Sequence, residues 1–141
     1  MKITDYIPQR KPFLFVDETF EYLENEIKTT YTFSENHDFF QGHFPGNPIV
    51  PGVILSEHCF QSAAALMGFK AKKGLKNLAV VSRIQSAKFK HIVPANGKIT
   101  TNTKLVEELG AAAYFKSVVQ NTEGKKVLIV EFACTLVQED T

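Results

Sequence analysis

A histidine and a glutamate in contrasting surroundings are the residues best suited to chemistry in this sequence. His43 lies in a segment rich in glycine and proline, and Glu57 follows fourteen residues later in an apolar segment that predicts a helix. Burial in such a helix favours the neutral acid form of a carboxyl group. Imidazole titrates near neutral pH and is the natural matching base. His43 is therefore a candidate base and Glu57 a candidate acid for concerted proton transfer.

The predicted start of the helix supplies a third component. Pro51 is well placed as its first residue, so Gly52 and Val53 fall in the first turn. Backbone N–H groups there have no acceptor within the helix, and the helix dipole makes that end positive. An oxygen that gains negative charge can bind there, and Gly52 leaves room for a close approach. A base, an acid and an oxyanion site together suit β-elimination next to a carbonyl group.

Four further residues are candidates for supporting roles. Gln61 lies four residues after Glu57 on the same helix face, so it either hydrogen-bonds to Glu57 or is satisfied by backbone groups. His58 points about 100° away from Glu57 and is expected to make a packing or polar contact. Lys88 and Lys90 alternate along a predicted strand, so both lie on one face of it, where a positive patch can attract an acidic partner.

The remaining pattern predicts one helix and six strands. The helix runs from Pro51 to about Met67, ends at Gly68 and is apolar on almost every side. A long ordered loop precedes it. The strands are expected at residues 13–23, 27–33, 78–89, 98–109, 112–120 and 126–137. We therefore expect a single α+β domain over residues 1–141, in which an antiparallel sheet wraps around one long central helix, the hot-dog arrangement.

Composition narrows the class of protein. The 141 residues are 44% hydrophobic with a formal charge of +1, enough for a core but without the basic surface that nucleic acids require. The longest weakly polar stretch is interrupted by polar residues, so no membrane span is expected. Cys59 and Cys134 lack the spacing of a disulfide framework or a zinc site. Asp5 and Pro8 stand where a signal peptide needs an apolar run. We expect a cytoplasmic protein without a metal.

The central segment also carries a family resemblance. Residues 40–53, which contain His43 and Gly52, resemble together with Glu57 and Gln61 the signature of β-hydroxyacyl-acyl-carrier-protein dehydratases of the FabZ type. Residues 8–17 and 87–94 are similar to other segments of that family. The resemblance implies that a (3R)-3-hydroxyacyl thioester loses water to give the trans-2-enoyl thioester, in fatty-acid or related acyl-chain biosynthesis.

The same resemblance implies roles and partners. The residue at His43 removes the C2 proton, the acid at Glu57 helps the 3-hydroxyl group to leave, and the amide at Gly52 polarises the thioester carbonyl. Each site is shared between the two subunits of a homodimer, and the family often forms trimers of dimers. No metal or redox cofactor takes part. The acyl chain arrives on the phosphopantetheine of an acyl carrier protein, for which Lys88 and Lys90 are candidate contacts.

One departure from the family and two alternative functions remain open. Residues 58–60 are bulkier than the small residues common after the acid, which implies a shorter acyl tunnel. A hot-dog thioesterase would instead use Glu57 to activate water for hydrolysis of the thioester. A non-catalytic subunit would bind acyl carrier protein in support of another dehydratase, although such a subunit needs neither His43 nor Glu57.

Overall fold

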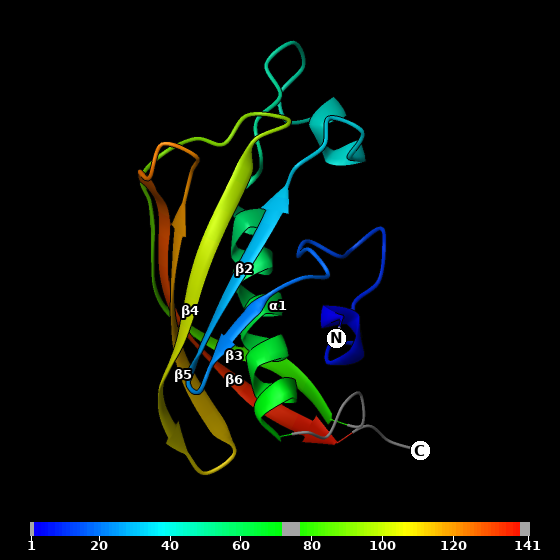
Figure 1. Cartoon of the computed structure of the whole chain (residues 1–141). Coiled ribbons are helices and arrows are strands. Elements are labelled where there is room, and N and C mark those ends of the chain that lie inside the picture. The colour runs from blue at the N-terminus through cyan, green and yellow to red at the C-terminus, as the bar shows by residue number, and fades with distance from the viewer. Residues whose placement is uncertain (1, 72–76, 139–141) are drawn as a thin grey trace.

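The computed structural model describes residues 2–71 and 77–138, which form a six-stranded antiparallel sheet packed against one long helix (Figure 1). The helices are η1 (Ile3–Asp5), η2 (Asp38–Gln41) and α1 (Gly52–Ala71). The strands are β1 (Glu21–Leu23), β2 (Glu26–Thr32), β3 (Asn77–Phe89), β4 (Lys98–Leu109), β5 (Ala112–Gln120) and β6 (Lys126–Gln138). Their order across the sheet is β1-β2-β4-β5-β6-β3. The expected α+β hot-dog arrangement is confirmed.

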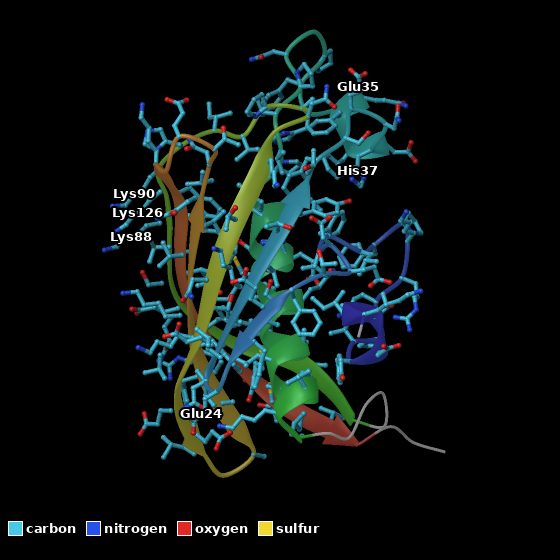
Figure 2. The ribbon with its side chains drawn as sticks, in the orientation of Figure 1. Glu24, Glu35, His37, Lys88, Lys90 and Lys126 are labelled. Atoms are coloured by element: carbon cyan, nitrogen blue, oxygen red, sulfur yellow. The ribbon has the colours of Figure 1, made fainter. Side chains whose placement is uncertain are left out.

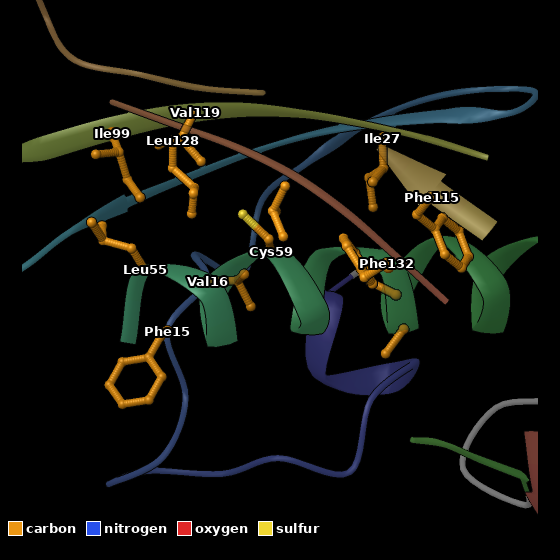
Figure 3. Packing of buried hydrophobic residues seen from close by; sticks show 14 of the residues in the cluster. Phe15, Val16, Ile27, Leu55, Cys59, Ile99, Phe115, Val119, Leu128 and Phe132 are labelled. Atoms are coloured by element: carbon orange, nitrogen blue, oxygen red, sulfur yellow. The ribbon is translucent and has the colours of Figure 1, made fainter. Parts of the chain in front are cut away.

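The helix α1 is covered on two sides, which explains why its sequence is apolar almost all round. On one side, Leu55 and Cys59 pack among side chains of the sheet such as Ile99 and Val119, all of which are buried (Figure 3). On the opposite side lies the N-terminal segment, whose Phe15 is also buried. The sheet and the N-terminal segment together bury the middle of α1, residues 55–66 for the most part.

The expected strand at residues 13–23 is wrong over most of its length, because only β1 at its end is a strand. Residues 13–17, here called the N-terminal strap, cross α1 instead. The backbone carbonyl of Phe13 and the backbone N–H of Phe15 are hydrogen-bonded to the side chain of Gln61. Hydrophobic periodicity cannot distinguish backbone that bonds to a buried side chain from backbone that bonds to a neighbouring strand.

The other five predicted strands are confirmed to within one residue at each end. The tight reversal between β4 and β5 is made by Gly110, whose φ of 61° lies in the left-handed region that favours glycine. The long loop before α1 contains η2 and a short bridge between Ile49 and Pro94. None of the helices in the described residues is long and apolar enough to cross a membrane.

The helix α1 is longer than expected, because it continues past Gly68 to Ala71. It begins at Gly52, directly after Pro51, whose carbonyl accepts the first hydrogen bonds of the helix. Gly68 has a packing role. A Cβ atom at Gly68 would lie 2.6 Å from the backbone oxygen of Tyr6, so the glycine lets the N-terminal segment approach the helix closely.

Replacing Gly68 with alanine is therefore expected to destabilise the protein, although alanine normally favours a helix interior over glycine by about 1 kcal/mol. Overpacking of this kind costs about 1–3 kcal/mol. Urea unfolding measures the free energy of both proteins. Gly42 has no atom within 4 Å of the corresponding Cβ position, so Gly42→Ala is the matched control. A Gly68→Ala protein as stable as this control would contradict the packing role.

Candidate active site

The environment of Glu57 favours its neutral acid form. The side chain is half-buried in the second turn of α1, and burial raises the pKa of its carboxyl group. A hydrogen bond from Gln61 lowers that pKa, but burial is the larger effect. Cys134 on β6 is near enough that the charge of Glu57, after burial, helps to raise the pKa of its thiol to about 12. The expectation of a buried acid on an apolar helix agrees with this geometry.

Gln61 holds Glu57 through a complete set of hydrogen bonds. Its Oε1 accepts the N–H of Phe15 at 2.8 Å, and its Nε2 donates at 3.0 Å to both the carbonyl of Phe13 and Oε2 of Glu57. The backbone donor and acceptor of the strap fix which end of the amide faces Glu57. Gln61, a candidate for substrate binding, has no exposed surface in this chain; it hydrogen-bonds to Glu57 and is also satisfied by backbone groups.

One ring nitrogen of His43, Nε2, has no hydrogen-bond partner among residues 2–71 and 77–138. Its Nδ1 lies 3.1 Å from the carbonyl of Ile49, to which it donates, and the N–H of Ile49 returns a bond to the carbonyl of His43 at 3.0 Å. A neutral imidazole that donates from Nδ1 carries its basic lone pair on Nε2. The ring of Phe44 stacks on the imidazole at 4.2 Å. The loop thus holds a partly exposed histidine whose Nε2 is the nitrogen available as a base.

The first turn of α1 offers backbone donors, as predicted. Within α1 the N–H groups of Gly52 and Val53 have no helical acceptor, and the residue Val53 is 76% exposed. A second reason why position 52 is a glycine was not indicated by the sequence. A Cβ atom at Gly52 would lie 3.0 Å from Cε1 of Phe89, so the ring of this half-exposed residue covers the backbone of Gly52.

His58 makes the polar contacts that were expected of it and is fully buried. Its Nδ1 donates to the carbonyl of Phe15 at 2.6 Å, and its Nε2 accepts from Oγ1 of Thr101 at 2.7 Å. Burial lowers the pKa of His58 to about 4, so the ring is neutral at neutral pH. The adjacent Cys59 is buried with a pKa raised to about 12 and behaves as a small apolar residue.

Lys88 and Lys90 are exposed and lie on one face of β3 and its continuation, as predicted. Figure 2 shows them beside Lys126, with all three side chains directed away from the sheet. Phe89, between them, directs its ring to the other face, against Gly52. The three lysines therefore lie on the outer face of the sheet, at the end where α1 begins.

The site residues of one chain fall into two groups. Glu57, Gln61 and the first turn of α1 form one group, and the loop with His43 forms the other. No hydrogen bond joins His43 to Glu57 within the described residues of one chain. No group of three or more His, Cys, Asp or Glu side chains in the described ranges is placed to hold a metal ion. The sequence did not indicate Phe15, Phe89 or Thr101, because their contacts are made by distant segments.

Sequence comparisons place the chain among dehydratases. Residues 20–128 match the ApeI-like family, described as ApeI dehydratase. The chain is 33% identical over 136 residues to the 3-hydroxyacyl-acyl-carrier-protein dehydratase FabZ of Proteus mirabilis, covering 94% of this chain and 89% of that protein. It is 43% identical over 93 residues to the FabZ of Lactobacillus helveticus, an alignment that covers 65% of this chain and 62% of that protein.

A solved structure has the same fold. The dehydratase heterocomplex ApeI:P from Xenorhabdus doucetiae matches all of this chain and 93% of that chain, with a TM-score of 0.80 and 12% sequence identity. At that identity the likeness concerns the fold alone.

Proposed function

Because the chain belongs to the ApeI-like family of FabZ-type hot-dog dehydratases, we propose that it eliminates water from (3R)-3-hydroxyacyl thioesters of acyl carrier protein. The product is the trans-2-enoyl thioester of an acyl chain under synthesis. The geometry of Glu57 carries this proposal. Burial raises the pKa of this half-buried carboxyl group and so favours its acid form, and an acid is what a departing hydroxyl group requires.

The proposed step needs two side chains and one backbone group. Nε2 of His43 takes the proton from C2 while the C2–C3 double bond forms. The C3–O bond breaks, and the departing hydroxide takes the proton of Glu57 and leaves as water. Negative charge that develops on the thioester oxygen is stabilised by the N–H groups of Gly52 and Val53 at the positive end of α1. The step breaks the C2–H and C3–O bonds and forms the C2–C3 double bond with one proton taken by His43 and one given by Glu57, so the proposal includes no metal or redox cofactor.

We propose that each site is completed by the loop of a second copy of the chain. The edge strand β3 supports a homodimer, because it is thirteen residues long and exposes the apolar side chains of Val80 and Ile84. A long apolar edge strand is a template for pairing with another chain. The separation of His43 from the hydrogen-bond network of Glu57 within one chain supports a shared site. The solved ApeI:P assembly contains two different chains, so a different partner at this edge is the alternative.

Lys88 and Lys90 are the proposed contacts for the carrier protein. With Lys126 they form a positive patch at the end of the sheet where α1 begins, and such a patch increases the association rate of an acidic partner.

The two buried cysteines are unpaired, which is typical of the reducing cytoplasm. We therefore propose that the protein acts there, on the carrier-bound acyl chain.

Replacing His43 with alanine, or Glu57 with glutamine, is expected to reduce turnover by about 10²–10⁴-fold, the contribution typical of a positioned acid or base. The assay follows the absorbance of the enoyl thioester, with the fold checked by circular dichroism.

Wild-type turnover should fall on the alkaline side as Glu57 ionises, and burial places that fall above the pH at which an ordinary glutamate titrates. Near-normal activity in either variant would refute the roles. Release of free thiol instead of enoyl product would indicate the thioesterase.

Replacing Lys88 and Lys90 together with glutamate is expected to raise KM for a carrier-bound substrate about tenfold at low salt, because the patch then repels an acidic carrier. The KM for a short thioester without a carrier protein should remain unchanged, since that substrate does not contact the outer face of the sheet. Equal changes of KM for both substrates would contradict the proposed contact.

A further inference from the structure

Phe15 in the N-terminal strap is held by two side chains of α1 at once. Gln61 accepts the N–H of Phe15 at 2.8 Å, and His58 donates to its carbonyl at 2.6 Å. Figure 3 shows Phe15 on the side of α1 opposite to the strands. The backbone N–H and carbonyl of Phe15 are therefore both satisfied by α1, the helix that carries Glu57. The two side chains that bind them, His58 and Gln61, are three residues apart along α1.

The position of Phe15 determines what Gln61 presents to Glu57. With the strap in place, Oε1 of Gln61 faces the N–H of Phe15, and Nε2 must then face Oε2 of Glu57. A neutral carboxyl group accepts such a hydrogen bond on its carbonyl oxygen, so its proton resides on the other oxygen, Oε1. If the amide turned over, its oxygen would face the carboxyl group and take up the acid's proton in a hydrogen bond. The orientation of Gln61 therefore decides whether that proton is available to a substrate.

His58 joins the strap to the sheet as well as to the helix. Its ring is fully buried, and its Nε2 accepts from Thr101 on β4 at 2.7 Å while Nδ1 donates to Phe15. The ring has no freedom to turn over without losing both bonds. Because His58 fixes the carbonyl of Phe15, it also fixes the N–H of Phe15, which together with the carbonyl of Phe13 sets the orientation of Gln61.

We propose that His58 is a positioning residue for the acid: through Phe15 and Gln61 it keeps the carboxyl proton of Glu57 on Oε1, directed away from Gln61. This inference rests on the proposed function, in which Glu57 delivers that proton. His58 itself contacts neither Glu57 nor a substrate surface, because it is buried against the strap and Thr101.

Few other titratable groups influence these two residues. Cys134 of β6 is the group coupled to Glu57, and its thiol is neutral because its pKa is raised to about 12. Asp17 of the strap acts on His58 by raising its pKa, against the larger lowering by burial. The thiol of Cys134 therefore stays neutral near neutral pH. A change in the titration of Glu57 in a variant of His58 can then be assigned to Gln61.

Two substitutions of His58 separate its two hydrogen bonds. In His58→Asn the side-chain amide occupies the place of Nδ1, so it retains the bond to Phe15 and loses the one to Thr101. In His58→Gln the longer side-chain amide occupies the place of Nε2, so it retains the hydrogen bond to Thr101 and loses the one to Phe15. Both variants lose one buried hydrogen bond, so a purely structural role predicts similar thermal stabilities and similar activities for both.

The pKa of the Glu57 carboxyl group, measured by carbon-13 NMR titration of the substrate-free protein, tests the proposal directly. His58→Asn is expected to keep the wild-type pKa. His58→Gln is expected to raise it, because the stabilising bond from Gln61 to the carboxylate is lost. In the dehydration assay, kcat of His58→Gln should fall about tenfold relative to His58→Asn at similar KM.

The same pKa in both variants and in the wild-type protein would overturn the proposal, and so would an equal rise in both. The NMR readout does not depend on turnover. If the wild-type protein does not dehydrate the substrate, the proposed function fails while the titration still tests whether His58 controls Glu57.

Discussion

The buried amide of Gln61 is the constraint on which the site depends. A helix that is apolar on almost every side can carry a carboxyl group only if that group is neutral or hydrogen-bonded. Burial raises the pKa of Glu57 toward its neutral form, and Gln61 donates a hydrogen bond to it. The three hydrogen bonds of Gln61 leave no unsatisfied donor, so the amide has one stable orientation. The N-terminal strap therefore forms part of the acid's support, although it is far from α1 in the sequence.

Much of the fold is predictable from the sequence because it depends on local patterns. The β-branched runs after residue 77 predict four strands to within one residue, and the spacing of Glu57 and Gln61 places both on one helix face. The strap was not predictable, since Phe13 and Phe15 read as strand residues and their partner is a side chain 46 residues or more away. Gly68 was misread as a helix end for the same reason, because its close contact is with the distant Tyr6.

In the proposed function, a helix and a loop of the same small chain divide the roles of acid and base between them. The helix provides Glu57 and the positive end at Gly52, while the loop before it provides His43 in a tautomer set by Ile49. The alignment with the FabZ of Proteus mirabilis covers 94% of the chain and so spans both parts of the proposed site. In the proposed homodimer, the exposed edge of β3 brings two copies together so that each loop reaches the helix of its partner.

Mixing two inactive variants tests this shared site most directly. His43→Ala and Glu57→Gln proteins are unfolded together, refolded in equal amounts and assayed for dehydration. If each site combines residues of two chains, a mixed dimer has one intact site. Random pairing then restores about a quarter of the wild-type activity. A mixture as inactive as either variant alone, with mixed dimers verified by mass spectrometry, would contradict a site built from two chains.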